Sequence, residues 1–159
     1  MADIYGGEAG IEFLATSWLT GFANYSYQEF SQTFTGFSRR GMPRYKFNIG
    51  LRGEWENGLN AETALYHMGA ATYPLGQAFT SFAPFFPPGV TPPSERVGSY
   101  NLLNIRAGYR FWHQKAEAGY MRDAEVAISA FNALNDKHQE YPLGDTIGSR
   151  VMGWLTIRF

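Results

Sequence analysis

The chain has 159 residues, a net charge of −1, no cysteine, and 17% aromatic residues. With no basic cluster beyond Arg39 and Arg40, it lacks the charge pattern of a nucleic-acid-binding protein, and without cysteine it has no disulfide or thiolate metal site. No stretch reaches the roughly 18 consecutive apolar residues that a transmembrane helix needs.

Alternation of apolar and polar residues predicts about seven β-strands, and the sequence contains no convincing amphipathic helix. The strands are expected near residues 4–14, 18–29, 44–55, 59–73, 100–111, 124–134 and 150–159. Segment 59–73 alternates too poorly for its faces to be assigned. In the clearest strand, one face carries Tyr45, Phe47, Ile49, Leu51 and Trp55, and the other carries Arg44, Lys46, Asn48, Arg52 and Glu54. In the 100–111 strand, Leu103, Ile105, Ala107, Tyr109 and Phe111 oppose Asn104, Arg106, Gly108 and Arg110.

The connections between these strands alternate in length. Tight turns are expected at 15–17 and at 56–58, where Asn57-Gly58 is a strong hairpin signal. Long connections are expected at about 30–42, 74–98 and 135–149, and an extended hairpin at 113–123. In an up-and-down meander, every second connection lies at the same end, so the short turns gather at one end and the long loops at the other.

Two arrangements explain strands with one apolar and one charged face. In a soluble sandwich or barrel the apolar face meets a core, whereas in an outer-membrane barrel it meets lipid and the polar face lines the lumen. Three features favour the membrane barrel. The strands have the length that a tilted span requires, aromatic rings concentrate near strand ends, and short turns alternate with long loops. The terminal "RVMGWLTIRF" then places Phe159 at the membrane interface.

Several segments resemble the C-terminal part of the barrel of TonB-dependent outer-membrane receptors. "DIYGGEAGIEF" is similar to an acidic-Tyr-Gly-Gly-Glu strand opening of that family, and a "NYSY" strand follows it. "MPRYKFNIGLR", "YNLLNIRAGYRF" and "VAISAFNALNDKHQEYPLGDTIGSRV" resemble later strands in the family's order. The final Phe159, with Leu155 and Ile157, resembles the signal read by the barrel assembly machinery.

The resemblance implies a partial wall of a larger antiparallel up-and-down transmembrane β-barrel in a bacterial outer membrane. Residues 1–159 are expected to be its C-terminal part, with the plug domain and N-terminal strands supplied by another part of the protein or another chain. The family imports scarce nutrients, such as ferric siderophores, with energy from TonB acting through the plug. If the C-terminus lies in the periplasm, loops 30–42, 74–98 and 135–149 are extracellular.

The residues give little support for catalysis or a cofactor, so the chain is interpreted as a transport protein and not an enzyme. His67, His113 and His138 lack metal-ligand spacing. A lumen-facing row is expected to contact the plug or an anionic ligand, or, in the favoured interpretation, to form an ion-pair lattice. This row comprises Arg44, Lys46, Arg52, Glu54, Arg106, Arg110, Arg150 and Arg158. Phe82, Phe85 and Phe86 in the longest loop are candidates either for ligand contact or for packing on one another.

Two other readings remain open. A small stand-alone outer-membrane barrel with a structural or adhesive role would need an even number of strands and pairing of the first strand with the last. A soluble ligand-binding barrel would need the apolar rows to pack inward.

Overall fold

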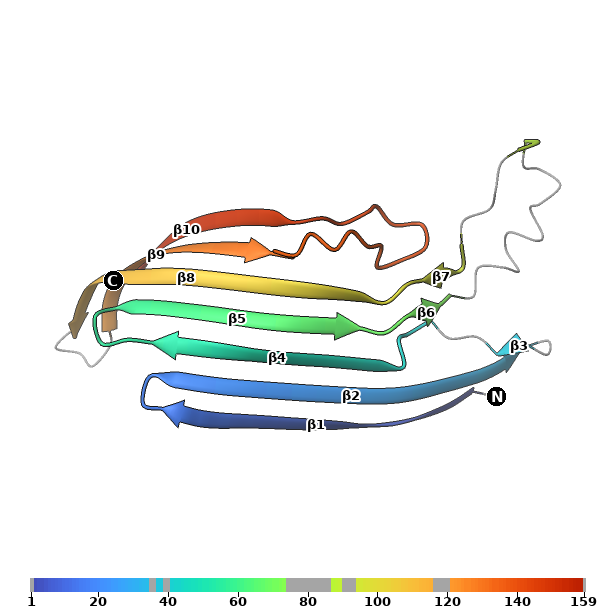
Figure 1. Cartoon of the computed structure of the whole chain (residues 1–159), viewed down its shortest axis with the longest axis horizontal. Coiled ribbons are helices and arrows are strands. Elements are labelled where there is room, and N and C mark those ends of the chain that lie inside the picture. Colours follow the sequence, from blue (N-terminus) through green and yellow to red (C-terminus); the bar gives the residue numbers. More distant parts are fainter. Residues whose placement is uncertain are drawn as a thin grey trace.

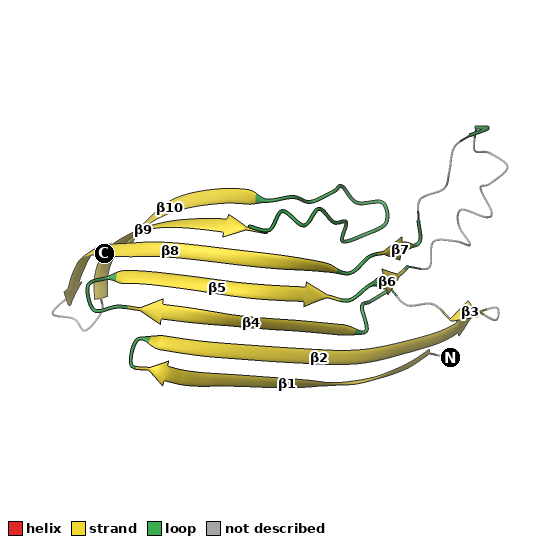
Figure 2. Ribbon diagram, viewed as in Figure 1, coloured by secondary structure: helices red, strands yellow, loops and turns green. Residues whose placement is uncertain are grey.

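The computed structural model describes residues 2–34, 37–38, 41–73, 87–89, 94–115 and 121–158. Within these ranges every regular element is a β-strand (Figure 2). No helix in the described part of the chain is long and apolar enough to cross a membrane.

Seven long strands form one antiparallel sheet whose spatial order follows the chain, β1-β2-β4-β5-β8-β9-β10 (Figure 1). The short β3 pairs with the end of β2, and β6 and β7 form a separate two-stranded ribbon. The strands are β1 (Ala2–Thr16), β2 (Leu19–Phe34), β3 (Phe37–Ser38), β4 (Tyr45–Glu54), β5 (Leu59–Met68), β6 (Ala71–Thr72), β7 (Arg96–Val97), β8 (Tyr100–Lys115), β9 (Met121–Phe131) and β10 (Arg150–Arg158).

The sequence prediction of an all-β, up-and-down sheet of seven strands is confirmed, and the structure differs from it in where several strands begin and end. The predicted 59–73 strand is divided, because β5 ends at Met68 and β6 begins only at Ala71. β2 continues to Phe34, into the predicted 30–42 loop. β8 and β9 extend from either side into the predicted 113–123 hairpin, leaving residues 116–120 of that connection outside the described part.

The connections separate by length, as predicted. The turns β1–β2 and β4–β5 lie at one end of the sheet, together with the end of β8, the beginning of β9 and the end of β10 (Figure 1). In the β4–β5 turn, Gly58 adopts a positive φ of 89°, which favours glycine, and its N–H donates to the Trp55 carbonyl at 3.0 Å. The segment after β2, the β6–β7 ribbon and the β9–β10 loop lie at the opposite end, called here the long-loop end.

The register of the strands fixes two faces. Arg52, Glu62, Arg106 and Ser129 are successive cross-strand partners, and this row belongs to the polar face. The neighbouring row, Leu51, Thr63, Ile105 and Ala130, belongs to the apolar face. These partners also show on which face each residue of β5 lies, which the sequence of segment 59–73 did not reveal.

The sheet is a single layer. Among the described residues, the buried apolar side chains are mostly small, such as Ala64 and Ala127, and no large side chain is fully buried. Large apolar side chains instead stand exposed on the apolar face, including Ile128, Val151 and Leu155. Neither face is therefore covered by a second layer within the described chain.

Aromatic rings cover glycines on the neighbouring strand on both faces. Phe13 and Gly21 are direct cross-strand partners, and a Cβ added to Gly21 would lie 2.3 Å from the Phe13 ring. On the polar face, Phe22 covers its partner Gly50 in the same way, at 2.5 Å. Such pairs let strands approach closely and fix their register.

A β-bulge interrupts β8. Arg110 is opposite Glu125 and Trp112 is opposite Ala124, so Phe111 between them has no partner on β9. The register therefore does not assign Phe111, which the sequence predicted to follow Tyr109 in the apolar row, to either face. The inserted residue shifts the alternation by one position, and Trp112 takes the next place in register.

Candidate functional site

The polar face gathers most of the charged residues that the sequence predicted to share a row. Lys46, Arg52, Arg106 and Arg110 lie on it by register, and so does Glu54, the partner of Asn60. The strands position these residues because side chains two positions apart in a strand point to the same side.

The densest interaction on this face centres on Glu125 of β9, which is 9% exposed. Arg106 from β8 donates one hydrogen bond to Glu125 and another to Asn60 of β5. Arg110 lies on the other side of the same carboxylate, with its Nη2 3.8 Å from Glu125 Oε2. Three adjacent strands are thus joined through one buried carboxylate, which interacts with two guanidinium groups.

Further ion pairs extend this pattern across the sheet. Arg52 of β4 donates to Glu62 of β5 at 3.0 Å, and Arg158 of β10 donates to both oxygens of Asp123 on β9 at 2.8 and 3.1 Å. Each pair links neighbouring strands. Ion pairs of this kind are what the lattice interpretation expects, but Lys46, Glu54 and Arg150 of the predicted row have no such pair among the described residues.

Arg44 and Arg150 depart from this pattern. Arg44 precedes β4, and its Nε lies 3.0 Å from Oε2 of Glu29. Glu29 has the strand parity of Tyr27, whose hydroxyl donates to it at 3.3 Å, and this parity is that of the apolar face. The guanidinium of Arg150 lies over the ring of its cross-strand partner Phe131, 5.2 Å from the ring centroid.

The apolar face carries aromatic residues toward both ends and aliphatic residues between them. At the short-turn end Trp18 and Trp55 stack with centroids 5.2 Å apart. Near the long-loop end, the ring of His67 stacks against Tyr45 at 5.7 Å and against Phe47 at 5.0 Å, and its Nδ1 lies 2.8 Å from Asn101 Oδ1. Ile49 and Leu51, in the middle of β4, are 53% and 45% exposed.

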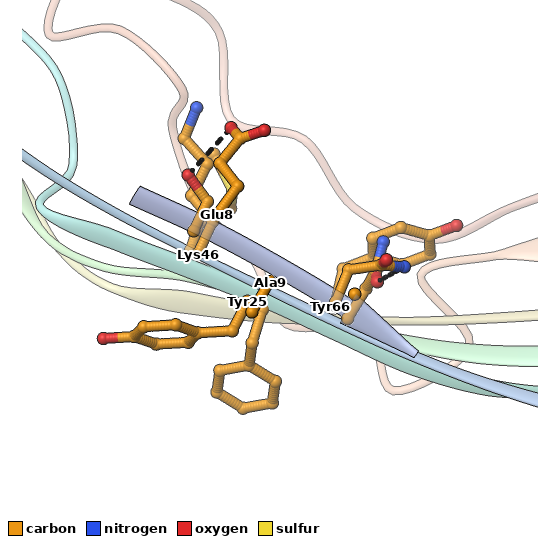
Figure 3. Close-up of a pocket in the computed structure, with 11 residues that line it drawn as sticks. Glu8, Ala9, Tyr25, Lys46 and Tyr66 are labelled. Carbon is orange, nitrogen blue, oxygen red and sulfur yellow. Dashed lines mark hydrogen bonds between the residues drawn. The ribbon is translucent and has the colours of Figure 1, made fainter. Parts of the chain in front are cut away.

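A shallow cavity of about 460 Å³ lies over β1, β2, β4 and β5, and Figure 3 shows the division between the faces there. Glu8, Lys46 and Tyr66 extend to one side of the sheet, while Tyr25 extends to the other (Figure 3). The Ser26 hydroxyl donates to Glu8 at 3.2 Å. Among the described residues, Lys46 has no carboxylate within ion-pair distance.

The β9–β10 loop is folded at its beginning. Asn132 is 4% exposed, has a φ of 51°, and exchanges hydrogen bonds with Asp136 in both directions, at 3.0 and 3.1 Å. The Asp136 carboxylate accepts the backbone N–H of Asn101, at the start of β8, at 2.8 Å. His138 is buried against Tyr100, with ring centroids 3.9 Å apart.

Four of the predicted site residues lie outside the described part of the chain: the loop aromatics Phe82, Phe85 and Phe86, and the terminal Phe159. Leu155 and Ile157 are described, and both stand on the apolar face of the edge strand β10, 60% and 52% exposed. Within the described residues, no group of three His, Asp or Glu side chains could hold a metal ion.

The sequence analysis missed the acidic half of the lattice. Asp123 and Glu125 alternate with Ala124 and Val126, a period-two signal that was available in the sequence. Their pairing with particular arginines depends on the β8 bulge and the strand register, which single-strand alternation does not reveal.

One comparison with known proteins gives a match. The family model described as TonB dependent receptor-like, beta-barrel matches residues 1–133, which is more than four fifths of the 159-residue chain. No curated protein matches the chain.

Proposed function

The chain belongs to the TonB-dependent receptor-like β-barrel family of outer-membrane receptors and transporters, and on this premise we propose that it forms wall strands and loops of such a receptor in a bacterial outer membrane. The cargo is a scarce nutrient such as a ferric siderophore. The protein's role is transport, with no catalytic step of its own.

The observation that carries this proposal is the two-faced single sheet. Tyr45, the first residue of β4, and Trp55, directly after its last residue, bound the apolar row and are ten residues apart in the sequence. Ten residues extend about 33 Å along a strand, which becomes about 25 Å across a bilayer at a tilt of about 40°. This height is that of the lipid-facing band of outer-membrane barrels, and the exposed Ile49 and Leu51 lie within it.

The directions of the two edge strands bear on how the barrel is completed. β1 and β10 both run from the long-loop end to the short-turn end (Figure 1). If they paired directly, that pair would be parallel, so an antiparallel closed sheet needs an odd number of strands between them. This weighs against a stand-alone seven-strand barrel. It supports the proposal that residues 1–159 are the C-terminal part of a larger barrel, completed by strands and a plug from the same protein or another chain.

In the proposed mechanism, loops 30–42, 74–98 and 135–149 face outward and capture the ligand, and the plug then rearranges under TonB-dependent force. The polar face borders the lumen, where its paired charges keep the wall electrostatically compensated. Leu155, Ile157 and Phe159 act earlier, as the signal for the barrel assembly machinery, and lipid covers the apolar face.

Cysteine labelling tests the orientation, because the chain has no cysteine of its own. We expect Asp145→Cys, in the β9–β10 loop, to react with a membrane-impermeant maleimide on intact cells. Asn57→Cys, in the short β4–β5 turn, is its matched control and reacts only after the outer membrane is permeabilised. Labelling of Asn57→Cys on intact cells, or recovery of the protein in the soluble fraction, contradicts the proposed placement.

Uptake measurements test the transport role separately. Cells that express the complete receptor should accumulate radioactive iron from a ferric siderophore, and loss of TonB should abolish this accumulation. If the protein is correctly placed in the membrane but no siderophore of a broad panel gives TonB-dependent uptake, the proposed cargo is wrong and the proposed placement still stands.

A further inference from the structure

A polar cavity of about 370 Å³ lies at the long-loop end, between the β6–β7 ribbon and the β9–β10 loop. The residues that line it include Arg96, Ser99, Asp136, Lys137, His138 and Thr146. The set contains two cationic side chains, one carboxylate and two hydroxyl groups, so the lining carries an excess of positive charge and several hydrogen-bond donors.

The two cations differ from most arginines of the wall because they lack a carboxylate partner. Among the described residues, neither Arg96 nor Lys137 has a carboxylate within 4 Å, and both are exposed. The carboxylate of Asp136 is already engaged by the backbone N–H of Asn101. Both positive charges are therefore available to a ligand.

The backbone on both sides of Lys137 is held in place. Asp136 exchanges hydrogen bonds with Asn132, and the Asp136 carbonyl accepts from Nδ1 of His138 at 2.7 Å. A carbonyl can only accept, so Nδ1 carries the proton in this bond. The backbone of His138 also pairs with Ile147 across the loop. Lys137 thus projects from an anchored segment.

Arg96 is anchored in a similar way on the opposite side of the cavity. Its N–H donates to the Ser94 hydroxyl at 3.1 Å, that hydroxyl donates to the Arg96 carbonyl at 3.2 Å, and β7 pairs with β6 at Thr72. The ribbon and the loop are joined as well, because the Tyr73 hydroxyl donates to the Glu140 carbonyl at 2.9 Å. Anchored cations lose little backbone entropy when a ligand binds.

We propose that this cavity binds a small anion with several carboxylate or phosphate groups. Arg96 and Lys137 contact separate anionic groups of the ligand, and Ser99 and Thr146 donate hydrogen bonds to its remaining oxygens. The inference deepens the proposed function, since it names the charge of the ligand that the outward-facing loops receive, and it rests on that function only for the cavity's position outside the membrane.

Equilibrium dialysis of the complete receptor in detergent tests the site, with radiolabelled citrate and inorganic phosphate as separate probes. At least one probe should bind at low salt, and raising the salt from about 0.05 to 0.5 M should weaken binding because it screens exposed charges. The double variant Arg96→Gln/Lys137→Gln should lower affinity by at least about tenfold.

The matched control is Lys115→Gln/Arg122→Gln, which removes two positive charges where β8 ends and β9 begins, at the opposite end of the sheet, and should leave binding unchanged. The proposal is wrong if neither citrate nor phosphate binds, or if the Arg96→Gln/Lys137→Gln variant binds a probe as tightly as the unchanged receptor does. It is also wrong if anionic phospholipid vesicles bind through these two residues while citrate and phosphate do not, because the cations would then serve a lipid headgroup. Failure of the membrane placement is detected independently by labelling at Asp145.

Discussion

Replacing the buried carboxylate of the polar face tests how far the ion-pair lattice holds the sheet together. Glu125→Gln keeps the size and shape of the side chain but removes its charge and replaces one accepting oxygen by an amide group that only donates, leaving Arg106 and Arg110 uncompensated. Removing one partner of a fully buried pair costs about 3–5 kcal/mol. The Arg106 and Arg110 side chains are 34% and 36% exposed, so water recovers part of this energy, and we expect a loss of about 2 kcal/mol.

The assay is urea unfolding of the complete receptor in lipid vesicles, followed by tryptophan fluorescence. With a urea dependence of about 2 kcal/mol per M, the midpoint should fall by about 1 M. The matched control is Glu54→Gln, on the same face but without an ion pair in the described structure, and its midpoint should change by less than about 0.3 M.

A double-mutant cycle separates pairing from a general effect of the substitution. Arg106→Gln combined with Glu125→Gln should cost less than the sum of the single changes, with a coupling of at least about 0.5 kcal/mol. Equal losses for Glu125→Gln and Glu54→Gln, or additive losses in the cycle, would refute the view that Glu125 acts through its arginines.

Three further predictions concern other parts of the sheet. Ile49→Arg, on the apolar face, should cost about 2–4 kcal/mol in vesicle refolding, whereas Asn48→Arg on the polar face should cost under about 1 kcal/mol; equal costs would contradict the assigned faces. Gly6→Ala should destabilise the sheet by about 1–3 kcal/mol because the added methyl would lie 2.3 Å from the backbone carbonyl oxygen of Tyr27 on β2, while Gly7→Ala, whose Cβ would meet nothing within 4 Å, should be neutral in the same urea assay. Asn132→Ala should make the β9–β10 loop cleavable by protease at least about tenfold faster without moving the unfolding midpoint of the wall, since it removes the hydrogen bonds that organise the loop; unchanged cleavage would show that the loop does not depend on them.

The alternation in "RYKFNIGLRGEW" predicted β4 and its two faces correctly because all the relevant information lies within one strand. The same reasoning failed where a neighbour decides the outcome. The faces of β5 could not be read from "LNAETALYHM", and they follow only from its pairing with β4 and β8. For the same reason, the sequence did not predict that Glu62 pairs with Arg52.

The sequence predicted which cations share the polar face, but it did not predict the carboxylates with which they pair. A strand pattern places Arg106 and Arg110 on the same side, but the carboxylate that joins them lies on β9 and reaches them through register. The β9–β10 loop was predicted as a long connection, and its internal order was not, because it depends on Asn132 adopting a positive φ and on contacts with Tyr100 and Asn101 of a different strand. Contacts between distant segments carry no local periodicity.

The bulge at Phe111 has a consequence for comparing this strand with its relatives. Before it, apolar side chains occupy odd-numbered positions such as Ile105 and Tyr109; after it, Trp112 shows that they occupy even-numbered ones. An alignment that runs without a gap from a relative lacking this extra residue would match apolar-face positions with polar-face ones on one half of the strand. Substitution patterns in β8 are therefore meaningful only when the two halves are counted separately from the bulge.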